Sequence, residues 1–130
     1  MIVELIISEL DFYLIEKVRE LRKKENISQV QLAQKIGVSE GFIGHVENPK
    51  QNHKYNIRML NRIANALKIK SYSDFFPDKV LSSDIVKIKI ELFDPKNKDR
   101  NSRFKSIKIT PCTDTEIEEY NKRQSRSGSN

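Results

Sequence analysis

The chain has 130 residues, of which 37% are hydrophobic and 32% charged, which suits one compact domain with an appendage rather than two independent cores. Its 24 basic and 18 acidic residues give a net charge of +6, which fits a polyanionic partner and equally fits simple solubility. The single cysteine, Cys112, excludes a disulfide framework, and no spacing of it with His45 and His53 suits zinc. We therefore expect no metal and no cofactor.

Residues 1–7 are apolar apart from Glu4, but the run is short and no basic segment precedes it. It predicts neither a signal peptide nor a membrane span. We expect a cytoplasmic protein without membrane contact.

Apolar residues recur at helical spacing from residue 10 to about residue 69. They include Phe12, Ile15, Val18, Leu21, Leu32, Ala33, Ile36, Ile43, Val46, Ile57, Leu60, Ile63, Ala64 and Leu67. The expected helix ends carry capping residues or a glycine, namely Asn26, Ser28, Gly37, Ser39 and Asn56. Residues 48–54 lack periodicity and predict a loop, and residues 73–77 predict a short turn that proline ends.

From residue 84 the hydrophobic period changes to two, which predicts a half-buried strand. Turn-forming residues occupy 94–99, and Phe104 and Ile107 begin a second strand. Because an isolated hairpin is only marginally stable, we expect it to pair with residues 2–7 or with the hairpin of a second chain.

These patterns predict a mainly α fold, a compact bundle of about five helices followed by a small β-hairpin. The helical domain is expected at residues 10–77, the hairpin at 84–110 and a further segment at 111–130. Within that last segment, residues 116–122 predict one or two helical turns, and residues 124–130 a disordered tail.

Residues 28–48 indicate a helix, a tight turn and a second helix. Ala33 is small where the two helices cross, and Gly37 can take the positive φ that turns the chain. Ile43 and Val46 lie three residues apart and are expected to face the core. Their role is to hold the opposite face of the second helix rigid.

This segment resembles the helix-turn-helix of phage-repressor and Cro-type transcriptional regulators. The matching pieces are Leu21–Arg22, Ser28–Gln29, Leu32–Ala33, Gly37–Val38–Ser39, Ile43 with Val46–Glu47–Asn48, and the closing residues 63–67. The resemblance covers residues 15–69 and implies a lambda-repressor-like bundle with a central helix-turn-helix. In that fold the second helix of the pair enters the major groove of DNA.

By the same resemblance, Glu40, Gly41 and His45 read bases, and helical geometry places Gly44 on the same face. Glutamate can accept from cytosine, and histidine can donate to guanine. Phe42 either touches a thymine methyl or anchors the helix. Each of the two glycines costs the helix about 1 kcal/mol relative to alanine and offers no side chain for reading.

Phosphate contacts are expected from the start of the first helix of the motif and from the region after the second. The candidate residues are Gln29, Asn48, Lys50, Lys54 and Arg58. The resemblance further implies that Gln29 braces the recognition helix, and that Arg22 and Glu47 form a partly buried ion pair. Arg19 is assigned to a solvated helix face together with Lys23 and Lys24.

The leading hypothesis is a sequence-specific transcriptional regulator, a repressor, that binds double-stranded DNA as a homodimer and associates with the nucleoid. The hairpin is the candidate for dimerisation or for a protein partner. The alternative is a protein-interaction module or antitoxin-like protein that keeps the fold but reads bases weakly. An enzyme is not expected, because the chain lacks a nucleophile–base set, a glycine-rich phosphate loop and a metal cluster.

Overall fold

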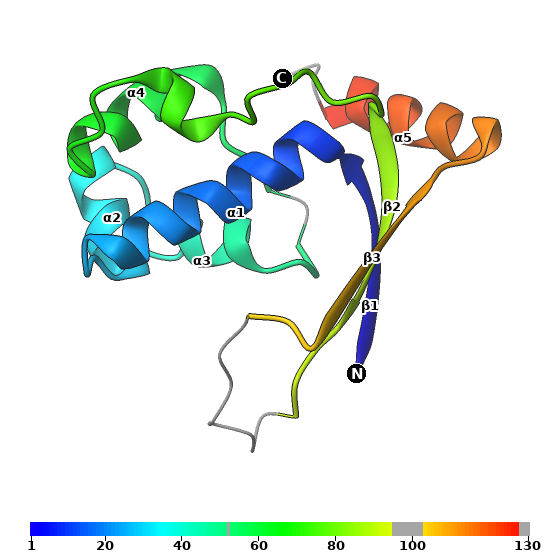
Figure 1. The fold of residues 1–130 in the computed structure, drawn as a ribbon, viewed down its shortest axis with the longest axis horizontal. Coiled ribbons are helices and arrows are strands. Elements are labelled where there is room, and N and C mark those ends of the chain that lie inside the picture. The colour runs from blue at the N-terminus through cyan, green and yellow to red at the C-terminus, as the bar shows by residue number, and fades with distance from the viewer. Residues whose placement is uncertain (52, 95–102, 128–130) are drawn as a thin grey trace. The chain divides into compact units, whose positions relative to one another are not determined.

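The computed structural model of the protein describes residues 1–51, 53–94 and 103–127 (Figure 1). The chain divides into two compact units. One unit combines Met1–Glu9 with Ser83–Asn130, and the other is Leu10–Ser82.

The helical unit contains the elements that the hydrophobic spacing predicts. The helices are α1 (Glu9–Lys24), α2 (Gln29–Ile36), α3 (Phe42–Glu47) and α4 (Ile57–Ala66), followed by the 3-10 turn η1 (Tyr72–Phe75). The core side chains come from all five elements and from Leu67 just after α4, and they include Leu14, Ile15, Val18, Leu32, Ala33, Ile36, Ile43, Val46, Leu60, Ile63, Ala64 and Phe75.

Two of the expected helix starts are confirmed in detail. Ser28 forms a capping box: its Oγ accepts from the Gln31 N–H at 3.0 Å, and its own N–H donates to Gln31 Oε1 at 2.8 Å. At the start of α4, Asn56 Oδ1 accepts from the Met59 N–H at 2.8 Å. The expectation for Ser39 is wrong, because its carbonyl accepts from the Phe42 N–H in a turn and the N-cap of α3 is Gly41.

The other unit is built on a three-stranded antiparallel sheet rather than on a hairpin alone. Its strands are β1 (Ile2–Ser8), β2 (Ile85–Glu91) and β3 (Ser106–Pro111), in the order β1-β2-β3 (Figure 1). The fold is therefore less purely helical than expected, because residues before the helical unit supply a strand. One face of the sheet carries apolar residues from every strand, with Leu5 opposite Ile88 and Ile88 opposite Ile109.

Helix α5 (Asp114–Ser127) is longer than the expected 116–122. The expectation of a disordered tail is wrong for residues 124–127, which belong to this helix. A second capping box explains its firm start. The Thr113 N–H donates to Glu116 Oε1 at 2.9 Å, and the Glu116 N–H donates to Thr113 Oγ1 at 3.2 Å. The expected turn at 95–99 and the end of the expected tail at 128–130 lie outside the described residues.

Candidate nucleic-acid interface

The turn between α2 and α3 depends on Gly37. Its φ of 76° lies in the left-handed region that favours glycine, and its N–H donates to the carbonyls of Ala33 and Gln34. Arg62 of α4 donates from Nη1 to the Ile36 carbonyl at 2.6 Å, so a free carbonyl at the end of α2 gains a partner. The direction in which α3 leaves the turn is thus defined by backbone geometry.

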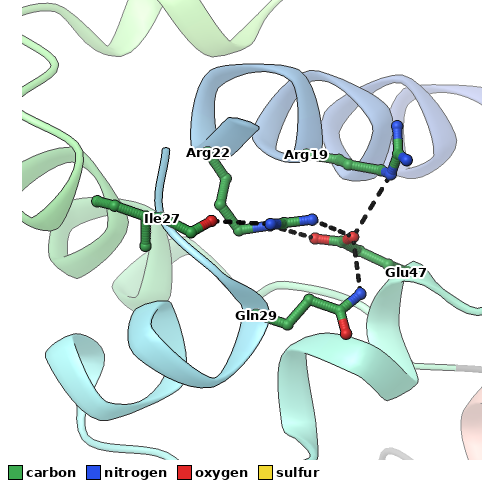
Figure 2. Close-up of polar contacts among 5 residues, drawn as sticks. All are labelled: Arg19, Arg22, Ile27, Gln29 and Glu47. Carbon is green, nitrogen blue, oxygen red and sulfur yellow. Dashed lines mark hydrogen bonds and ion pairs between the residues drawn. The ribbon is translucent and has the colours of Figure 1, made fainter. Parts of the chain in front are cut away.

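The buried ion pair that the resemblance implies is present. Arg22 donates from Nε to Glu47 Oε2 at 3.0 Å and from Nη2 to Oε1 at 2.9 Å, and the two residues are only 7% and 3% exposed. The remaining guanidinium nitrogen, Nη1, donates to the Ile27 carbonyl at 2.8 Å. The bidentate geometry therefore joins the end of α1 to the end of α3 (Figure 2).

Two further residues converge on the same carboxylate, as Figure 2 shows. Gln29 Nε2 donates to Glu47 Oε1 at 3.1 Å, which confirms that the first residue of α2 braces α3. Arg19 Nε lies 3.7 Å from the same oxygen, so the expectation of a solvated Arg19 is wrong. Glu47 thus connects α1, α2 and α3.

The glycines of the expected reading face have distinct neighbours. A Cβ added at Gly44 would lie 3.2 Å from Gln29 Oε1, so glycine lets the Gln29 side chain approach α3 closely. A Cβ at Gly41 would lie 3.7 Å from both Cε1 and Nε2 of His45, an ordinary contact distance. Gly44 therefore borders α2, whereas Gly41 borders the imidazole of His45.

Three of the expected reading positions, Glu40, Gly41 and His45, are exposed, whereas Gly44 is half-buried. Glu40 and Gly41 lie in the turn before the helix rather than inside it, because α3 begins at Phe42. Glu40 Oε1 is 3.5 Å from Gln34 Nε2 of α2. On the opposite side, Ile43 is fully buried and Val46 is 3% exposed, as the helical spacing predicts.

The expected phosphate-contacting residues occupy the ends of neighbouring elements. Gln29 begins α2, and Asn48 ends α3 and accepts through Oδ1 from the Lys50 N–H at 2.9 Å. Lys50 and Arg58 are exposed, whereas Lys54 lies 3.7 Å from Asp11 Oδ2 of α1. Lys54 therefore already has an acidic neighbour within its own unit.

Comparison with known proteins identifies the helical part of the chain. Residues 15–76 match a family model described as a helix-turn-helix domain, and the matched residues include α2, α3 and the Glu47 contacts. Residues 15–76 are a helix-turn-helix domain. The resemblance of this segment to regulators of the phage-repressor type is thereby confirmed, and that family is DNA-binding and non-enzymatic.

Solved structures similar to the helix-turn-helix domain include three bacterial proteins. The restriction-modification controller protein C.AhdI from Aeromonas hydrophila is 29% identical, and the match covers 45% of this chain and 85% of that one with a TM-score of 0.39. An HTH_3 family transcriptional regulator from Vibrio cholerae is 25% identical, and the match covers 69% of this chain and 53% of that one with a TM-score of 0.43. The hypothetical transcription factor NHTF from Neisseria is 24% identical, and the match covers 54% of this chain and 78% of that one with a TM-score of 0.46. A comparison with curated proteins found no match.

In the part of the chain that the structure describes, no helix is both long and apolar enough to cross a membrane. The same residues contain no group of three or more acidic, histidine or cysteine side chains arranged to hold a metal ion.

One residue beside the helix-turn-helix, His53, is not predicted from the sequence as part of the site. It lies in the aperiodic stretch after α3, yet its ring stacks on His45 at a centroid distance of 5.5 Å. Phe42, for which two roles were open, makes edge contacts with His53 and Tyr55. No periodicity links a loop residue to a helix eight positions earlier, so the sequence offers no signal for this contact.

Proposed function

We propose that the chain is a sequence-specific transcriptional regulator, a repressor in the cytoplasm and associated with the nucleoid, that inserts α3 into the major groove. The observation that supports this best is the asymmetry of α3. Ile43, Val46 and Glu47 hold its inner side, while His45 remains exposed, as does Glu40 in the turn before the helix. In this proposal Glu40 accepts from cytosine and His45 donates to guanine.

Phosphate contacts position α3 in the groove. Gln29 stands at the N-terminus of α2, where backbone N–H groups and the helix dipole favour an anion, and its side chain is already oriented by Glu47. Arg58 is exposed in the first turn of α4. Together with Asn48, Lys50 and Lys54, these residues would hold the backbone on both sides of α3 without reading sequence.

We further propose that two copies bind together, because one short helix reads few base pairs and repressors of this class read half-sites about one helical turn apart. The sheet offers a suitable surface. Ile107 and Ile109 of the edge strand β3 are each 44% exposed, although their partners on β2, Ile90 and Ile88, are fully buried. An apolar edge strand favours pairing with another strand.

A protein-interaction module or antitoxin-like partner protein is the second candidate. It is favoured by the reading face itself, on which Glu40 is negative and Gly41 has no side chain. The exposed isoleucines of β3 would then contact a different protein rather than a second copy.

Titration of a fluorescently labelled random duplex at increasing salt distinguishes the two candidates. For a DNA-binding regulator, the logarithm of the binding constant falls linearly with the logarithm of the salt concentration, with a slope of about 0.9 for each neutralised phosphate. Arg58→Ala is expected to weaken binding to all duplexes alike and to lower the slope by about 1. Lys79→Ala, another exposed basic residue, outside the proposed interface, is the control and is expected to change neither quantity. Absence of binding at low salt would exclude the regulator.

A further inference from the structure

The two histidines of the chain lie against each other on the exposed side of the helix-turn-helix domain. His45 belongs to α3, and His53 lies in the segment between α3 and α4. Their ring centroids are 5.5 Å apart and the ring planes differ by 22°, which is a stacked arrangement. Both residues are exposed. Burial alone therefore does not explain why these two rings meet.

His53 is connected to the core by two further rings. Phe42 makes an edge contact with His53 at 6.4 Å and 64°, and another with Tyr55 at 6.4 Å and 62°. Tyr55 is only 6% exposed. Such edge-to-face contacts favour defined ring orientations. The series Tyr55, Phe42, His53 and His45 thus runs from the core to the outward side of α3.

The Cε1–Nε2 edge of the His45 ring lies beside Gly41. A Cβ added at Gly41 would be 3.7 Å from both Cε1 and Nε2 of the imidazole, so this edge of the ring lies beside a residue without a side chain. An exposed histidine on a helix otherwise changes rotamer on the picosecond to nanosecond timescale. Stacking on His53 restricts the ring, and glycine at position 41 places no side chain against its Nε2 edge.

We propose that His53 is a specificity-determining residue, which positions the exposed His45 imidazole so that its Nε2 edge meets a purine acceptor in the major groove. The inference rests on the proposed DNA-reading function and deepens it. His53 acts through His45, because a donor held in the bound geometry loses less freedom on binding than a mobile one. It is therefore a positioning residue.

The test is selection of bound duplexes from a random pool by the wild type, His45→Ala, His53→Ala and His53→Phe. We expect His53→Ala to reduce the base preference about three- to tenfold at the one position where His45→Ala abolishes it. His53→Phe is expected to retain most of the preference, because a phenyl ring can stack on His45. The double variant with alanine at both His45 and His53 is expected to lose no more base preference than His45→Ala, since both residues act through one contact.

Three measurements separate positioning from a merely structural or electrostatic role. Random-duplex affinity, its salt slope and the midpoint of thermal unfolding are expected to be unchanged in His53→Ala. Gln51→Ala, an exposed residue of the same segment, is the matched control and is expected to leave the base preference intact. Uniform loss of affinity in His53→Ala with a lower salt slope would show a phosphate contact instead and would overturn the inference.

A readout without DNA tests the geometry itself. In nuclear magnetic resonance spectra, the ring protons of His45 are expected to shift in His53→Ala, as the neighbouring ring current is lost, and to shift less in His53→Phe. Unchanged His45 shifts in His53→Ala would overturn the stack. Normal selection by the wild type with an unchanged preference in His53→Ala contradicts only this inference. A wild type that selects no sequence contradicts the proposed function as well.

Discussion

Glu47 is the residue on which the orientation of α3 depends most. Its carboxylate receives hydrogen bonds from Arg22 and Gln29 and lies 3.7 Å from Arg19 Nε, so one buried charge contacts α1 and α2. The sequence predicts the Arg22–Glu47 pair through family resemblance alone. It does not predict that Arg19 contacts Glu47, because the direction in which a long side chain points depends on where the next helix lies.

Removing one partner of this ion pair is expected to be costly. Arg22→Ala should lower the free energy of unfolding by about 3–5 kcal/mol, since it leaves the Glu47 carboxylate buried without its main partner. Urea denaturation measures the loss. Lys23→Ala, at the exposed neighbouring position, is the control and is expected to change stability by less than about 0.5 kcal/mol. A loss for Arg22→Ala as small as that of the control would contradict the role given to the pair.

At the scale of elements, capping and periodicity predicted most helix positions, while their exact starts and lengths depended on hydrogen bonds that periodicity does not reveal. The helical spacing placed α1, α2 and α4, and Ser28 and Asn56 cap as expected. The turn at Ser39 delays α3, and the capping box of Thr113 with Glu116 extends α5. Strand β1 was an open alternative because its pairing with β2 spans the whole helical unit in sequence.

The start of α5 is expected to make its unit sensitive to acid. The pKa of Glu116 is lowered from 4.5 to about 2, chiefly because Lys87 donates to its carboxylate and because the Thr113 N–H donates as well. A carboxyl group whose pKa is lower in the folded protein contributes stability above its unfolded pKa. That contribution is lost as the pH falls from about 4.5 to about 2.

Thermal unfolding of the wild type and Glu116→Gln at several pH values measures this contribution. The two midpoints are expected to differ at neutral pH and to converge as the pH approaches 2. Glu119→Gln, an exposed position of the same helix, should follow the wild type throughout. A difference between wild type and Glu116→Gln that persists undiminished at the acid limit would show that ionisation is not its cause.

For the whole molecule, the assembly of two copies is a separate prediction. Ile109→Lys places a charge on the exposed apolar side of β3 and is expected to convert a dimer into a monomer in sedimentation experiments. Ile57→Lys, at another exposed isoleucine, on α4, is the control and should remain dimeric. A wild type that sediments as a monomer at all concentrations, or a dimeric Ile109→Lys, would contradict the role of β3.

The helix-turn-helix could be predicted because its residues obey local rules of capping, glycine geometry and spacing, and a family model matches them. The arrangement of the reading face could not be predicted in the same way. Gly44 borders Gln29, and His45 stacks on a loop residue, because these contacts depend on how separate elements pack. Gly44, within α3, thus makes room for Gln29, whereas Gly41 caps the helix and places no side chain against the His45 ring.

The most direct test of the proposed function is selection of duplexes from a random pool by the full chain. We expect enrichment of one short sequence, present as two half-sites whose centres are about 34 Å apart, or about one helical turn. We also expect His45→Ala to remove the preference at one position of each half-site while random-duplex affinity persists. A pool that remains random after repeated selection, from protein shown to be folded, would contradict the claim that α3 reads DNA.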